Sequence, residues 1–137
     1  MSYGALASTV LVSSGHFEEA LKRATAEIAA LPDEPEAYFN RAQALVGLQR
    51  WDEAVADCEA ALQLDASASG LDPAALDDEL FSALRHLAVS RKDRPDEALA
   101  VLARYRALLP GGRHIGDLAT WEDHVRGVET VWYRERA

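Results

Sequence analysis

The chain has 137 residues, 49% of them hydrophobic, which is enough for one domain with a continuous core. Its 14 basic and 23 acidic side chains give a net charge of −9, which disfavours nucleic acid and anionic membranes as partners. The single cysteine, Cys58, excludes an intramolecular disulfide and a paired-cysteine zinc site, so a reducing compartment, the cytoplasm, is expected.

The charge is unevenly distributed along the chain. Residues 1–78 carry 4 basic and 14 acidic side chains, net −10, whereas residues 79–137 carry 10 and 9, net +1. A cationic partner would therefore favour the first part of the chain. No apolar run approaches the roughly 20 residues that span a bilayer, and no basic residue precedes the first apolar stretch, so we expect neither a membrane segment nor a signal peptide. Twelve of the basic residues are Arg, which hints at a bacterial source.

The sequence repeats itself at a spacing of 34 residues. A shift of 34 superposes GHFEEALKRATAEIAALPDE on QRWDEAVADCEAALQLDASA, and both segments carry apolar residues at helical spacing. Each segment is therefore predicted to form an amphipathic helix with one buried stripe. Ala20 and Ala54 take equivalent positions, where a small side chain lets two helices approach closely. The two stripes are Phe17, Ala20, Leu21, Ala24 and Ile28, and Trp51, Ala54, Val55, Cys58 and Leu62.

Residues 35–68 spell one complete unit of two helices, and this unit resembles the tetratricopeptide repeat family. The residues that carry the resemblance are Tyr38, Ala42, Leu45, Ala54, Cys58 and Ala61. Residues 1–34 form a first unit in which Ala20, Ala24 and Pro32 fit the pattern. The resemblance implies antiparallel helix pairs that stack into a right-handed α-solenoid, because one pair cannot bury its apolar faces alone.

A third unit, residues 79–112, follows when an insertion at residues 69–78 is allowed. Asp96, Glu97 and Ala98 repeat the Asp-Glu-Ala of the second unit at a spacing of 44. The family pattern is broken in this unit by Arg85, His86, Pro95 and Tyr105.

Within and after the insertion, Asp72-Pro73 or Asp77 is expected to open a lengthened helix that ends near Ser90. The acidic run Asp77-Asp78-Glu79 is expected to cap a helix start.

The last segment, residues 113–137, is predicted to be one amphipathic helix that caps the solenoid. Its apolar residues are Leu118, Trp121, Val125, Val128 and Trp132, and its polar side is Glu122, Asp123, Arg126, Glu129 and Arg134. The alternative is that Trp132 and Tyr133 contact a partner. The expected fold is thus a single all-α domain of three helix-turn-helix repeats and a capping helix, about seven helices.

No catalytic, cofactor-binding or metal site is expected. Phosphate loops, zinc-protease and serine-hydrolase motifs do not occur in the sequence. Cys58 lies on an apolar stripe, where a buried, inert thiol is the common case. The four histidines have no metal-ligand spacing and are expected to be exposed; they are His16, His86, His114 and His124.

In the tetratricopeptide family the first helix of each unit lines a concave groove. The resemblance therefore implies a groove lined by Thr9, Val12, Glu36, Phe39, Asn40, Gln43, Val46, Leu80, Ala83, Leu84 and Leu87, with Ala5 beside them. A mainly apolar groove suits an extended segment or amphipathic helix of a partner protein. The alternative for Leu84 and Leu87 is that they pack under neighbouring helices.

One subclass of the family grips the C-terminal carboxylate of heat-shock chaperones with Lys, Asn and Arg, and Asn40 is the only match here. This clamp is therefore not expected. The expected function is a non-catalytic adaptor or scaffold that binds another protein. Two alternatives are a chaperone similar to those of type III secretion, and a structural module that self-associates as a homo-oligomer.

Overall fold

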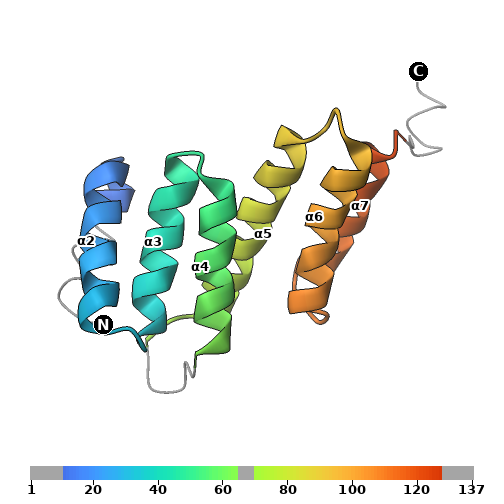
Figure 1. Cartoon of the computed structure of the whole chain (residues 1–137). Coiled ribbons are helices and arrows are strands. Elements are labelled where there is room, and N and C mark those ends of the chain that lie inside the picture. The colour runs from blue at the N-terminus through green and yellow to red at the C-terminus, as the bar shows by residue number, and fades with distance from the viewer. Residues whose placement is uncertain (1–10, 65–69, 128–137) are drawn as a thin grey trace. The chain divides into compact units, whose positions relative to one another are not determined.

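The computed structural model of the chain describes residues 11–64 and 70–127, and every regular element in these ranges is an α-helix (Figure 1). Residues 11–13 are the end of one helix. The helices that follow are α2 (Phe17–Ala30), α3 (Pro35–Gly47), α4 (Trp51–Gln63), α5 (Pro73–Ser90), α6 (Pro95–Leu108) and α7 (Ile115–Val125). The predicted all-α class of helical repeats is confirmed.

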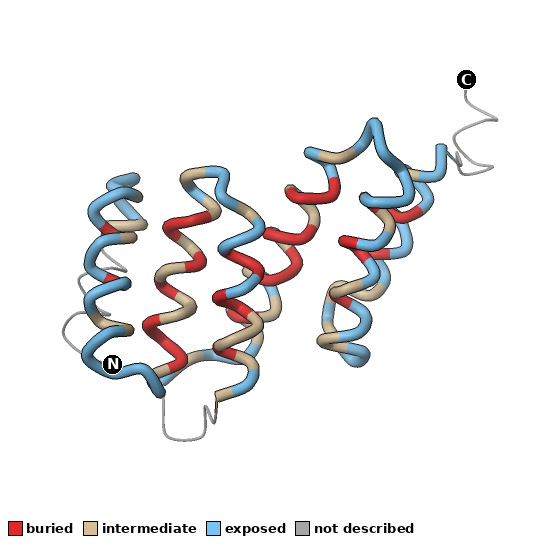
Figure 2. Tube along the Cα trace, viewed as in Figure 1, coloured by how far each residue is buried: buried red, intermediate tan, exposed pale blue. Residues whose placement is uncertain are grey.

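The chain divides into two compact units, Met1–Ala83 and Leu84–Ala137, with the boundary inside α5. In the first unit α3 packs against both α2 and α4. Buried positions recur along α3 and α4 (Figure 2). Alanines fill much of this contact, because a side chain of one carbon lets the helix axes approach closely. The fully buried alanines of the first unit are Ala20, Ala37, Ala42, Ala44, Ala54 and Ala83.

Both predicted apolar stripes face the interior. Ala20 and Ala24 of α2 are buried, as are Ala54, Val55 and Cys58 of α4. The other large residues of the stripes are half-buried; these are Phe17, Leu21, Ile28, Trp51 and Leu62. The 3.6-residue period of the sequence therefore identified the buried face of both helices.

The turns of the first unit repeat the spacing of 34 in their backbone conformation. Gly15, before α2, has φ +80°, and Gln49, before α4, has φ +61°. A left-handed residue at this point ends one helix and redirects the chain into the next. In the second turn the Arg50 amide N–H donates a 2.8 Å hydrogen bond to the Leu45 carbonyl, which secures the end of α3.

Close packing at this same end of α3 depends on a glycine. A Cβ atom on Gly47 would overlap the ring of Phe17, so the start of α2 rests directly on the backbone at the end of α3. Only glycine allows this approach.

The lengthened helix that the sequence predicts is α5, which begins within the predicted insertion and continues into the third predicted repeat. The Asp72 carboxylate accepts a 3.0 Å hydrogen bond from the Ala74 backbone N–H, Pro73 is the first residue of α5, and the helix ends at Ser90. The expectation for Asp77-Asp78-Glu79 is wrong, because these residues lie inside α5 rather than at its start. Asp72 already supplies the cap, so the helix begins one turn earlier.

In the second unit α6 packs against α7, and a tyrosine replaces the small residue that the repeat pattern favours. Tyr105 is fully buried, and its hydroxyl accepts a 3.0 Å hydrogen bond from the His114 backbone N–H. A Cβ on Gly112 would overlap that hydroxyl, so the glycine makes room for it. The departure at Tyr105 is thus accommodated by a neighbouring glycine and a satisfied hydroxyl.

The capping segment is described as far as Gly127, and α7 ends at Val125. Leu118 is fully buried, in agreement with the predicted stripe. Glu122, assigned to the polar side, is instead buried, because its carboxylate pairs with Arg106 of α6 at 2.7 Å and 3.2 Å. Trp121 and Val125 of the predicted stripe are half-buried, and Asp123 and Arg126 are exposed, as predicted. Five further predicted residues of this segment lie outside the described residues; they are Val128, Glu129, Trp132, Tyr133 and Arg134.

Candidate partner-binding site

Five of the predicted groove residues share one face of α3, and we call them the α3 stripe. Three of them, Phe39, Gln43 and Val46, are half-buried and so retain exposed surface. The other two, Glu36 and Asn40, are each only 3% exposed. The α3 stripe thus offers an apolar surface with one amide, bounded at the N-terminal end of the helix by a buried carboxylate.

The remaining predicted groove residues contribute little surface. Leu80, Ala83, Leu84 and Leu87 of α5 are all buried. Val12 is half-buried, and Thr9 lies outside the described residues. The burial of Leu84 and Leu87 agrees with the alternative hypothesis that these two residues pack under neighbouring helices instead of lining a groove. Partner binding at any of these positions stays a prediction, and the α3 stripe is the part of it that solvent reaches.

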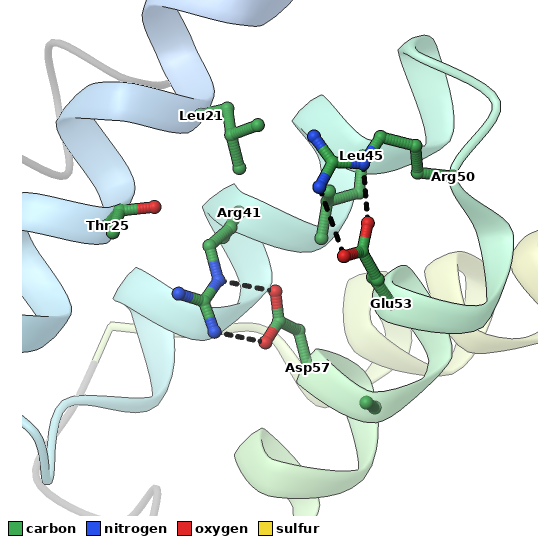
Figure 3. A pocket seen from close by; sticks show the side chains of 8 residues that line it. Leu21, Thr25, Arg41, Leu45, Arg50, Glu53 and Asp57 are labelled. Carbon is green, nitrogen blue, oxygen red and sulfur yellow. Dashed lines mark hydrogen bonds and ion pairs between the residues drawn. The ribbon is translucent and has the colours of Figure 1, made fainter.

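A second candidate surface is an open cavity of about 370 Å³ formed by α2, α3 and α4 (Figure 3). Its walls are partly apolar, from Leu21 and Leu45, and partly charged. The lining residues are Leu21, Thr25, Arg41, Leu45, Arg50, Glu53, Ala56 and Asp57. None of them belongs to the α3 stripe, so the first unit has two distinct candidate surfaces.

An ion pair between helices forms one wall of the cavity. The Arg41 guanidinium donates two hydrogen bonds to the Asp57 carboxylate, at 2.7 Å and 2.8 Å. The Arg41 side chain is 26% exposed and that of Asp57 only 7%. The hydrogen bonds to Asp57 raise the pKa of Arg41 above its usual value, despite the opposing effect of burial. This planar, two-bond geometry fixes the position of α3 against α4.

A second pair, Arg50 with Glu53, forms within the first turn of α4 and is exposed. Hydrogen bonding from Arg50 lowers the pKa of the Glu53 carboxyl. In Figure 3 both arginines are occupied by these carboxylates. The cavity therefore has no uncommitted arginine with which to grip an anion.

Sequence reasoning did not find the Arg41–Asp57 pair, although a signal for it exists. Arg41 and Asp57 lie 16 residues apart, centred on Gln49 in the turn between α3 and α4. Residues equidistant from a tight turn face each other across an antiparallel helix pair. Arg106 and Glu122 have the same separation, centred on His114 in the turn between α6 and α7. Opposite charges placed symmetrically about a predicted turn would have identified both pairs.

No group of three or more potential metal ligands occurs among residues 11–64 and 70–127. His16 and His124 are exposed, as predicted, whereas His86 and His114 are half-buried. Burial in an apolar environment raises the pKa of the Cys58 thiol, which keeps it protonated and unreactive. None of the helices in the described part of the chain is both long and apolar enough to cross a membrane.

The helix pairs, their small buried residues and the spacing of 34 are the defining features of a known repeat. Residues 6–69 match the model of that repeat, the tetratricopeptide repeat. Residues 6–69, slightly less than half of the chain, are therefore similar to the tetratricopeptide repeat family. The match covers both helices of the second predicted unit and extends back into the first.

Two curated relatives show how local the sequence similarity is. Sperm-associated antigen 1 of mouse is 54% identical over 52 residues, which are 38% of this chain and 6% of that protein. The human protein of the same name is 49% identical over 53 residues, 39% of this chain and 6% of its own length. The chain therefore corresponds to a small fraction of these relatives.

A solved structure extends the comparison to most of the chain. The TPR2B domain of yeast Sti1, in a complex with pHsp70, matches with a TM-score of 0.57 and 21% identity. The match covers 93% of this chain and all of that domain. At this level of identity the likeness establishes the tetratricopeptide fold, an all-α arrangement of helical repeats.

Proposed function

We propose that the chain is a non-catalytic adaptor that binds a segment of another protein on the α3 stripe. The observation that carries this proposal is the partial exposure of Phe39 and Val46 on a helix whose opposite side is packed between α2 and α4. Tetratricopeptide repeats are typically protein-interaction modules, and this helix corresponds to the groove-lining helix of a repeat. The proposal includes a bacterial, cytoplasmic setting, favoured by the single buried cysteine and the arginine-rich composition.

The proposed organisation is one repeat domain. It consists of repeats at residues 1–34, 35–68 and 79–112, an insertion at 69–78 and a cap at 113–137. The packing of α3 against α4 supports the second of these repeats.

The Sti1 domain was solved with pHsp70, but a carboxylate clamp is not part of this proposal. Asn40 is buried, as are Leu80 and Leu84, which occupy positions where a clamp needs polar or basic side chains. An anionic tail would find no cation on the α3 stripe. We therefore expect a partner that offers apolar side chains.

The test is capture of binding proteins from a lysate of the source organism with two matched variants. One variant changes the α3 stripe, Phe39→Ala with Val46→Ala, and the other changes the cavity, Leu21→Ala with Thr25→Ala. Loss of two apolar contacts from an interface should weaken binding at least tenfold. We expect a protein that the wild type and the cavity variant retain and that the stripe variant loses. Circular dichroism confirms that all three proteins are helical.

Other outcomes would count against the adaptor function on this face. A protein lost only with the cavity variant would move the interface to α2 and α4. Concentration-dependent self-association that needs Phe39, without any captured partner, would favour the self-associating module.

A further inference from the structure

The carboxylate of Glu36 is buried and has no hydrogen-bond partner among the residues that the structure describes. Its side chain lies in the first turn of α3, the residue is 3% exposed, and both Oε1 and Oε2 are inaccessible to water. Neither oxygen accepts a hydrogen bond from any group in residues 11–64 and 70–127. Buried polar atoms are almost always paired, and an unpaired charge is among the most unfavourable groups that a fold can bury. The position therefore calls for a reason outside the stability of the free protein.

Helix capping does not supply that reason. Four helices carry an acidic residue at the second position of the first turn, where it interacts favourably with the helix dipole. Glu18, Asp52 and Asp96 are exposed at that position, and only Glu36 is buried. The dipole interaction is available to an exposed carboxylate, so it does not require the burial of Glu36.

The insertion covers Glu36. A Cβ atom on Gly70 would lie only 2.8 Å from Glu36 Oε1, so the backbone of the insertion rests directly on the carboxylate. In Figure 1 the short segment from residue 70 to the start of α5 runs past the start of α3. A ligand can reach the carboxylate only if this cover moves, which lowers the apparent affinity by the population of the open state.

The charge of the first unit favours a cation as that ligand. Residues 1–83 carry 4 basic and 15 acidic side chains, net −11. Three of the four basic side chains already pair with acids, as Arg23–Glu19, Arg41–Asp57 and Arg50–Glu53. A carboxylate in an environment of this sign attracts a cation and repels an anion.

We propose that Glu36 anchors an Arg or Lys side chain of the partner segment that lies on the α3 stripe; this inference rests on the proposed function. Phe39 is three residues along α3 from Glu36, and the Cβ atoms of residues three apart on one helix face lie about 5 to 6 Å from each other. An extended segment advances about 3.3 Å per residue, so the cation and the apolar side chain on Phe39 are about two positions apart. The recognised element is thus a basic residue, one intervening residue and a large apolar residue.

The test uses synthetic peptides with capped ends and a host of alanine. One peptide contains Arg-Ala-Leu, and its partner contains citrulline-Ala-Leu, which keeps the shape of arginine without its charge. Binding to the wild type, Glu36→Gln and Phe39→Ala proteins is followed by nuclear magnetic resonance titration. We expect the wild type to bind the Arg peptide about tenfold more tightly than the citrulline peptide. The Glu36→Gln protein should bind the two peptides with equal affinity. Phe39→Ala should weaken the binding of both peptides.

The possible failures are distinguishable. If Glu36→Gln still binds the Arg peptide more tightly than the citrulline peptide by the wild-type factor, and Phe39→Ala still weakens binding, Glu36 is not the anchor of the cation. The proposed function would then remain intact. Binding of both peptides that is indifferent to Phe39→Ala, or no detectable binding of the Arg peptide to the wild type, would overturn both.

A stability measurement on the free protein adds an independent check. Because the Glu36 carboxylate is buried and unpaired, Glu36→Gln should raise Tm by a few degrees. The matched control is Glu18→Gln, which changes the equivalent residue of α2, where the carboxylate is exposed. That control should leave Tm unchanged or slightly lower it. A Glu36→Gln protein with a lower Tm would show that the carboxylate stabilises the free protein, and this would overturn the proposal.

Discussion

At the scale of single residues, the spacing of the helices is set by small side chains at repeated positions. Ala20, Ala54 and Ala98 occupy equivalent places at the start of α2, α4 and α6, and each is fully buried. The sequence predicted the role of these alanines, because they recur at the repeat spacing within an apolar stripe.

Ala54→Leu should lower the free energy of unfolding by about 1 to 3 kcal/mol or more, because the site has no room for the added carbons. The control is Ala56→Leu, an exposed position of the same helix, which should change stability by about 0.5 kcal/mol or less. Urea unfolding followed by circular dichroism measures both. Equal stability of the two variants would contradict the assigned register.

Glu79 is a second residue whose environment has a measurable consequence. Burial, with a smaller effect of the adjacent Asp78, raises the pKa of its carboxyl from 4.5 to about 7. The folded protein therefore holds a proton at Glu79 that the unfolded chain releases. Between about pH 4.5 and pH 7 the native state binds more protons than the unfolded state, so stability falls as pH rises.

Replacement of this carboxyl should flatten the pH dependence. Glu79→Gln should be more stable than the wild type above pH 7, by about 2 kcal/mol, and the difference should vanish near pH 4. Thermal unfolding at a series of pH values measures it, with Asp77→Asn as the control that retains the wild-type slope. A wild type and a Glu79→Gln variant with parallel pH profiles would show that Glu79 is solvated.

At the scale of helices, ion pairs of two kinds are present in the first unit. Arg41–Asp57 joins α3 to α4 with a nearly buried carboxylate, whereas Arg50–Glu53 is an exposed pair within a single helix. Removal of one partner of a buried pair leaves an uncompensated charge, whereas exposed pairs contribute little to stability.

Arg41→Met should therefore destabilise the protein by about 2 kcal/mol, because Asp57 is left buried without its cation. Arg50→Met, its matched control, should have a much smaller effect. Replacement of both partners, Arg41→Met with Asp57→Leu, should recover most of the loss. Chemical denaturation measures the free energy of unfolding of the three variants. A larger loss of stability in Arg50→Met than in Arg41→Met would contradict the assignment of Arg41–Asp57 as the structural pair.

The positions of the helices were largely predictable from the sequence. Which side chains a neighbouring helix or loop buries was only partly predictable. Periodicity identified the buried faces of α2 and α4, and Asp72-Pro73 located the start of α5, because both signals are local. The burial of Glu122 and Leu87 depends on which neighbouring helix covers them, and one sequence holds no such information. Glu36 is the clearest case, since its burial arises from the insertion more than 30 residues further along the chain.

At the scale of the whole molecule, acidic charge and candidate binding surfaces both lie in the first unit. That unit has a net charge of −11, and it contains both the α3 stripe and the cavity formed by α2, α3 and α4. The second unit has a packed hairpin of α6 and α7, and Arg85 of α5 lies over the ring of Trp121 of α7 at 5.4 Å. Both surfaces at which we propose partner binding could occur therefore belong to the first unit.

The most direct test of this account is photo-crosslinking from single positions. A benzophenone amino acid replaces Phe39 in one protein and Thr25, on the cavity side, in another. The account predicts that position 39 crosslinks to a different polypeptide in the lysate of the source organism, and that position 25 does not. Crosslinks that form only from position 25, or only to a second copy of this chain, would contradict a partner-binding site on the α3 stripe.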